Sequence, residues 1–207
     1  MSSYWEVIAS KRANSILDKI PLEWRLSQDD LAYAKSQKNL KTVIPRFLNE
    51  YERKIVKMDT MQILGMTQNG QWRVKDVVEA HCKIACIAHQ IVWIYDSLFF
   101  SNFSVFFFHP TEKKALEKAE RLDRQHKNNM PKGVLHGLPI SLKDQFHVKG
   151  SDTTMGYVGW IGTFEGDGES EKVGRVDSEI VAQLESMGAV VFCKSTTNTA
   201  GKQKAIQ

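Results

Sequence analysis

Cysteine is scarce in this 207-residue chain, which contains only Cys82, Cys86 and Cys193. An odd number of cysteines without the spacing of a secreted framework argues against a disulfide-built fold and favours reduced thiols inside a cell. The first residues also lack the basic segment and apolar core of a secretory signal. We therefore expect a cytoplasmic protein.

Neither sign of charge is concentrated in one stretch. The 28 basic and 24 acidic residues give a formal net charge of +4, and no five like charges follow one another. A nucleic-acid footprint needs clustered basic residues with interleaved aromatic residues, so we expect no nucleic-acid partner. The charges are typical of a solvated surface.

Several patterns of catalytic or phosphate-binding residues are absent as well. No Gly-x-Ser-x-Gly, Ser-Ser-Gly-Gly or Ser-x-x-Lys sequence occurs, so no serine nucleophile is evident. A glycine-rich stretch covers residues 150–174, but it lacks the phosphate-binding pattern Gly-x-x-x-x-Gly-Lys-Ser/Thr. A loop that lines a small-molecule cleft is the better interpretation of this stretch.

Apolar residues recur with helical spacing over much of the first 125 residues, and a hydrophobic content of 42% is enough for a sizeable core. Ser27 is positioned to cap a helix, although Asp30 stands where a full capping box has glutamate. Pro45 is expected to interrupt the pattern. The segments predicted as helices are 4–20, a piece that begins at Ser27, 49–59, 60–66, 72–91 and 111–123.

The helix at 72–91 places Cys82, Cys86 and His89 on one face, at spacings of four and three. Thiolates and imidazole suit zinc, but a structural zinc site needs a fourth ligand and a second arm, and neither is evident. Buried free cysteine behaves as a small hydrophobic residue. We therefore predict core packing here and no metal.

The stretch 91–108 is unusual because six of the ten phenylalanines fall in its last twelve positions. Three interpretations remain open: a buried strand pair, a membrane span, or an insertion or translated non-coding sequence outside the fold. Asp96 and Asn102 near the middle disfavour a bilayer span, so we expect no membrane partner.

Residues 138–143 alternate between apolar and other side chains, which predicts a short strand with Ser141 and Lys143 on one face. A helix at 177–188 and a strand at 189–193, apolar on both faces, follow later in the chain. A strand, a helix and a buried strand predict a crossover unit with parallel pairing. The residues expected to be buried in this helix are Ile180, Val181, Leu184 and Met187, with Gly188 as its stop.

The segment His136-Gly-Leu-Pro-Ile-Ser-Leu-Lys-Asp144, followed by Gly150 and Thr153-Thr-Met-Gly-Tyr157, resembles the first half of the amidase signature family, nearest its fungal acetamidase-like branch. The resemblance implies an α/β fold in which an N-terminal helical region, 1–72, precedes the first part of an α/β/α amidase signature domain, 73–207. In that fold the sheet is mixed, and here it is expected to be incomplete. Residues 92–109 and 199–207 do not resemble the family.

Members of this family hydrolyse a carbon–nitrogen amide bond with a Ser-cisSer-Lys triad, whose lysine matches Lys143. A lysine that accepts a proton must be neutral, so its pKa must lie well below the free value of about 10.4. We therefore expect Lys143 to be buried or close to other positive charges. The resemblance implies a small amide substrate and no metal or organic cofactor, and it leaves the oligomeric state open. The candidate pocket residues are Thr153, Thr154, Met155 and Gly156.

In the family, both catalytic serines come after the lysine. The segments that carry them do not occur in these 207 residues. We therefore expect this chain alone to be inactive, because a nucleophile and its base act as one unit. An inactive amidase fragment or a binding protein is the alternative. A subunit that resembles the A subunit of a tRNA-dependent amidotransferase ranks lower, since residues 152–160 resemble the acetamidase branch more closely.

Overall fold

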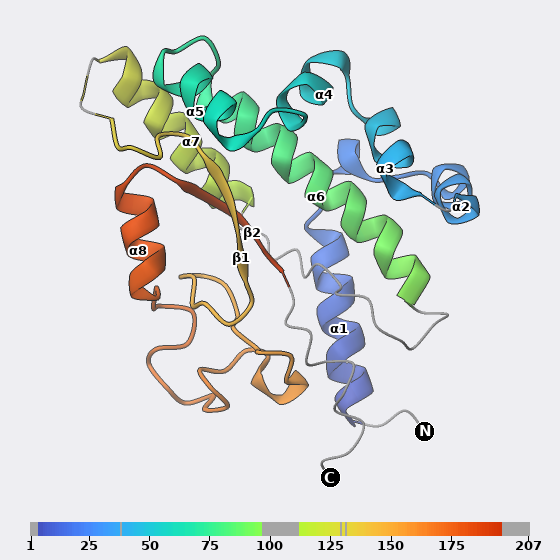
Figure 1. Ribbon diagram of the computed structural model, residues 1–207. Helices are drawn as coiled ribbons and strands as arrows, with labels where there is room; N and C mark the ends of the chain where they lie inside the picture. Colours follow the sequence, from blue (N-terminus) through green and yellow to red (C-terminus); the bar gives the residue numbers. More distant parts are fainter. Residues whose placement is uncertain (1–3, 38, 97–111, 129, 131, 196–207) are drawn as a thin grey trace.

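The computed structural model describes residues 4–37, 39–96, 112–128, 130 and 132–195. Within these residues, helices surround two parallel strands, β1 (Pro139–Lys143) and β2 (Val190–Ser195) (Figure 1). The predicted α/β class is confirmed. The α-helices are α1 (Tyr4–Asp18), α2 (Gln28–Ser36), α3 (Leu40–Val43), α4 (Glu50–Val56), α5 (Thr60–Gln68), α6 (Val74–Asp96), α7 (Glu112–Lys127) and α8 (Glu179–Ser186). Three 3-10 helices are η1 (Leu22–Trp24), η2 (Ile44–Phe47) and η3 (Val158–Trp160).

Reciprocal side-chain caps explain where α2 and α4 begin. At α4, Asn49 accepts from the backbone N–H of Glu52, and the Glu52 carboxylate accepts from the backbone N–H of Asn49. Ser27 and Asp30 form the same pair at α2. The shorter side chain of Asp30 therefore completes the capping box, although the glutamate of a full capping box is missing.

Helix α6 is the central element of the helical part. It packs against α2, α4, α7 and β2, and its buried face includes Val78, Cys82 and Cys86. All three cysteines of the chain are free and buried. Cys82 and Cys86 therefore lie in the apolar core, as predicted. Within the described ranges, no group of three or more His, Cys, Asp or Glu side chains could hold a metal ion.

Helices cover both faces of β2. Val191 packs with Val181 of α8 on one face, while Val190 and Cys193 pack with residues of α1, α6 and α7 on the other. Figure 1 shows α8 on one side of the strands and α6 on the other. The prediction of a covered, parallel second strand is therefore confirmed.

Helix α8 connects the two strands and ends before Gly188, which has a φ of +93°. A Cβ atom at this position would lie 2.9 Å from the Cα atom of His136, so the close approach requires glycine. The prediction that Ile180 is buried is wrong, because this side chain is 42% exposed. Successive helical positions differ by about 100°, and the neighbouring Val181 occupies the position that faces the sheet.

Helix α6 extends to Asp96, beyond the end predicted at Ile91. The rest of the phenylalanine-rich stretch, 97–108, lies outside the described residues, so its three interpretations stay open. In the part of the chain that the structure describes, no helix is both long and apolar enough to cross a membrane.

Candidate functional site

The parallel strands end side by side, and each carries a lysine near its end. Lys143 lies opposite Ser195, and Lys194 lies opposite Leu142. Lys143 and Ser141 are both exposed, whereas Leu142 between them is buried. The predicted shared face of Ser141 and Lys143 is confirmed, but the expectation that Lys143 is buried is wrong for this chain.

Strand alternation explains why Lys143 is exposed. Successive side chains of a strand point to opposite faces, and the two neighbours of Lys143, Leu142 and Asp144, are both buried. Lys143 therefore points away from the core. We call the exposed side of β1 that carries Ser141 and Lys143 the open face.

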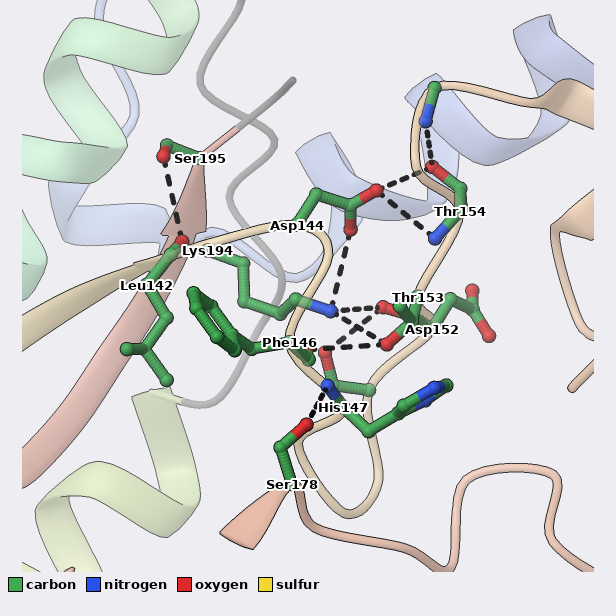
Figure 2. Close-up of polar contacts among 12 residues, drawn as sticks. Leu142, Asp144, Phe146, His147, Asp152, Thr153, Thr154, Ser178, Lys194 and Ser195 are labelled. Carbon is green, nitrogen blue, oxygen red and sulfur yellow. Dashed lines mark hydrogen bonds and ion pairs between the residues drawn. The ribbon is translucent and has the colours of Figure 1, made fainter. Parts of the chain in front are cut away.

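Lys194 is the buried lysine of the pair, with only 1% of its surface exposed. Its Nζ atom donates to the carbonyl oxygen of Asp152 at 2.7 Å and to Thr153 Oγ1 at 2.9 Å. The same atom lies 3.4 Å from Asp144 Oδ1. Figure 2 shows these three oxygens converging on the amine. An ammonium group has three donors, so the site matches the full donor capacity of Lys194.

Asp144 connects β1 to the loop that follows. Its Oδ2 atom accepts from the backbone N–H and from the hydroxyl of Thr154, at 3.0 and 2.7 Å. Its own backbone N–H donates to the carbonyl oxygen of Ser195 at 2.6 Å. Asp144 therefore joins the ends of both strands to the loop.

The four candidate pocket residues form one turn, 153–156, next to this carboxylate. Thr153 is buried, and the other three residues are partly buried. Met155 and Gly156 have φ angles of +49° and +85°, in the left-handed region. Thr154 Oγ1 accepts from the backbone N–H of Gly156 at 3.2 Å, which closes the turn. The structure thus brings these residues together at the exit of β1.

Helix α1 reaches the same loop from the N-terminal part of the chain. Arg12 Nη2 lies 3.0 Å from Asp152 Oδ2, and the two side chains are 15% and 21% exposed. Water screens such a partly buried ion pair less than a surface pair. The carbonyl oxygen of Asp152 accepts a hydrogen bond from Lys194, so Arg12 and Lys194 both bind Asp152.

The electrostatics of this site are dominated by the burial of Lys194. Burial lowers the pKa of Lys194, and the Asp144 carboxylate partly offsets this effect. Arg12 adds a smaller lowering. Lys194 and Asp144 together place one positive and one negative charge in the interior.

A hollow of about 370 Å³ lies elsewhere, between α7, α8 and the loop after β1. Its lining includes Lys114, Lys118, Arg121, Lys149 and Glu185, and the lining contains neither Lys143 nor the 153–156 turn. This hollow is a charged surface depression. We assign the candidate site by the polar contacts at the strand ends, because those contacts involve the candidate pocket residues Thr153 and Thr154.

Sequence reasoning missed the parts played by Lys194, Asp144 and Arg12. One signal was available for Lys194, which directly follows a strand that is apolar on both faces. A lysine in that position is buried along with the strand. No pattern in the sequence pairs Arg12 with a loop 140 residues later.

Comparisons with known proteins give a consistent result. A model of the Amidase family matches residues 102–203. The chain is 33% identical over 196 residues to an acetamidase of Aspergillus oryzae, covering 94% of this chain and 32% of that protein. It is 32% identical over 200 residues to an acetamidase of Emericella nidulans, covering 95% and 32% respectively. The chain therefore spans about a third of the length of these relatives.

Among solved structures, a fatty acid amide hydrolase matches with a TM-score of 0.69 and 23% sequence identity. The match covers 93% of this chain and 31% of that one. At this identity the match shows the fold alone. The helical part and the strand pair therefore have the same arrangement as about a third of that longer chain.

Proposed function

Because the chain belongs to the amidase family and is similar to fungal acetamidases, we propose that it supplies the proton-relay lysine, Lys143, for hydrolysis of small amides. One observation carries this proposal. Lys143 ends β1 on an open face, and the next residue, Asp144, is hydrogen-bonded to the turn 153–156 that carries the candidate pocket residues.

The proposed chemistry moves one proton in two steps. A neutral Lys143 amine accepts a proton, through a serine relay, from the serine hydroxyl that attacks the amide carbonyl carbon. The proton then passes to the leaving nitrogen as the carbon–nitrogen bond breaks. Water hydrolyses the resulting acyl ester and regenerates the hydroxyl.

This role requires two things that the described residues do not supply. A serine pair must approach the open face, and further protein must cover Lys143, because burial favours the neutral form of an amine that this role needs. We propose that both come from sequence other than these 207 residues. By themselves the 207 residues then release no ammonia from acetamide or benzamide above background.

A chimera tests the proposal. The full 207-residue chain replaces the segment of the Aspergillus oryzae acetamidase that it matches, and ammonia release from acetamide is measured. We expect turnover that Lys143→Ala lowers to background, because removing one member of a nucleophile-base unit removes most of its catalysis. The matched control is Lys149→Ala, another exposed lysine on the loop after β1, and it retains turnover.

Two outcomes contradict the proposal. Turnover that survives Lys143→Ala in the chimera excludes Lys143 as the relay. Amide hydrolysis by the 207 residues alone, if Lys143→Ala removes it, shows that no outside serine is needed.

A further inference from the structure

We propose that Lys194 is a positioning residue of this site, which holds Lys143 in place without touching the substrate. The inference rests on the proposed function of Lys143. Lys194 is the most deeply buried charged side chain near the strand ends, and its amine joins three oxygens that belong to two separate segments, the exit of β1 and the loop at 152–153.

The contacts of Lys194 favour a positioning role over simple core packing. Burying a charge is costly unless it is paired and hydrogen-bonded, and an apolar side chain on a covered strand avoids that cost. Lys194 lies where Asp144, Asp152 and Thr153 each provide one acceptor. A full set of directional partners fixes the relative position of these segments, which an apolar side chain does not do.

The position of Lys143 depends on these contacts through its own backbone. Asp144 directly follows Lys143, and its carboxylate lies between Lys194 on one oxygen and Thr154 on the other. The backbone N–H of Asp144 also donates to Ser195 on β2. The chain is therefore held immediately after Lys143, and the turn 153–156 is held at a fixed distance from it.

The acetamidase chimera described above distinguishes positioning from folding. We expect Lys194→Met to lower kcat by about a hundredfold, as for a misplacement near 1 Å, with little change in KM. A loss of folded protein lowers the apparent rate only in proportion to the unfolded fraction, which circular dichroism measures. The control is Lys83→Met, which removes a partly buried lysine bonded to Glu52 between α6 and α4.

Amide hydrogen exchange on the 207-residue chain gives a second readout that needs no activity. In Lys194→Met, exchange at the Thr154 and Gly156 N–H groups is expected to rise about tenfold as the Asp144 contacts loosen. The Val190 N–H, which donates to Leu138 at the other end of the strand pair, serves as the internal reference and stays protected. If Lys194→Met does not fold, the double variant Lys194→Met with Asp144→Asn removes both buried charges and is measured in its place.

The outcomes separate the two proposals. Turnover that survives Lys143→Ala overturns the proposed function. If Lys143→Ala abolishes turnover while Lys194→Met keeps the parent kcat, only the positioning role of Lys194 is overturned. Unchanged exchange at Thr154 and Gly156 in the folded variant overturns it as well.

Discussion

Cys193 and Lys194 are neighbours on β2, and burial favours the neutral form of both. It raises the pKa of the Cys193 thiol to about 12 and lowers the pKa of the Lys194 amine. Lys143, at the end of β1, is exposed. The difference between the two lysines follows from position, because β2 is covered on both faces and Lys143 lies on the open side of β1.

Cys193 is expected to be almost unreactive in the folded chain. At pH 8 a thiol with a pKa of about 12 carries about a thousandfold less thiolate than one near 9, and the thiolate is the nucleophile. Alkylation with iodoacetamide, followed by mass spectrometry of the Cys193 peptide, should show slow labelling in buffer and fast labelling in urea. Native labelling at the rate of a free thiol would contradict the burial of this strand.

At the scale of elements, helix starts are fixed both by local caps and by contacts between helices. Helices α2 and α4 begin at capping boxes within a few residues of sequence. Helix α6 differs, because Asp123 of α7 accepts from the backbone N–H groups of Val74 and Lys75 at 2.7 and 3.0 Å. The first turn of the central helix is thus capped by another helix.

Asp123→Ala is expected to lower the free energy of unfolding by about 1–2 kcal/mol, because two N–H groups of α6 lose their acceptor. Urea unfolding followed by circular dichroism measures the change. Glu120→Ala, one turn earlier on α7, is the control. The contact of Glu120 with Lys75 is an exposed ion pair, so Glu120→Ala should lower the free energy of unfolding by less. Equal effects of the two substitutions would argue against a cap by Asp123.

At the scale of the whole molecule, the buried His136 and the partly buried His81 couple folding to pH. Burial lowers the pKa of His81, although the carbonyl of Val77 partly opposes this. Burial also lowers the pKa of His136, with help from the charges of Lys132 and His126 and against that of Asp123. The unfolded chain therefore binds protons near pH 6.5 that the folded chain does not bind.

The folded state should consequently lose stability as the pH falls below about 6.5, and this destabilisation is absent above it. The slope is at most about 1.4 kcal/mol per pH unit for each histidine. Urea midpoints measured between pH 7.5 and 5 give the slope. His136→Gln should reduce it, whereas an unchanged slope in that variant would show that His136 titrates alike in both states.

Much of the element pattern could be predicted from sequence because it depends on neighbouring residues. Helical spacing located α6, alternating apolar residues located β1, and an apolar run located β2. The twenty residues around Lys143 carried the family resemblance, which the comparisons confirmed. The prediction that Ile180 is buried was wrong, because a short helix presents only a narrow face to the sheet.

Local sequence patterns predicted most of the helices and strands, and they placed a lysine at the end of β1. They did not show that Lys143 is exposed, or that Arg12, Asp144, Asp152 and Lys194 meet, because these features depend on tertiary packing. Periodicity and caps are properties of adjacent residues. An ion pair between residues far apart depends on strand register, which shifts between Ile140 and Ser141, and on which helices cover each face.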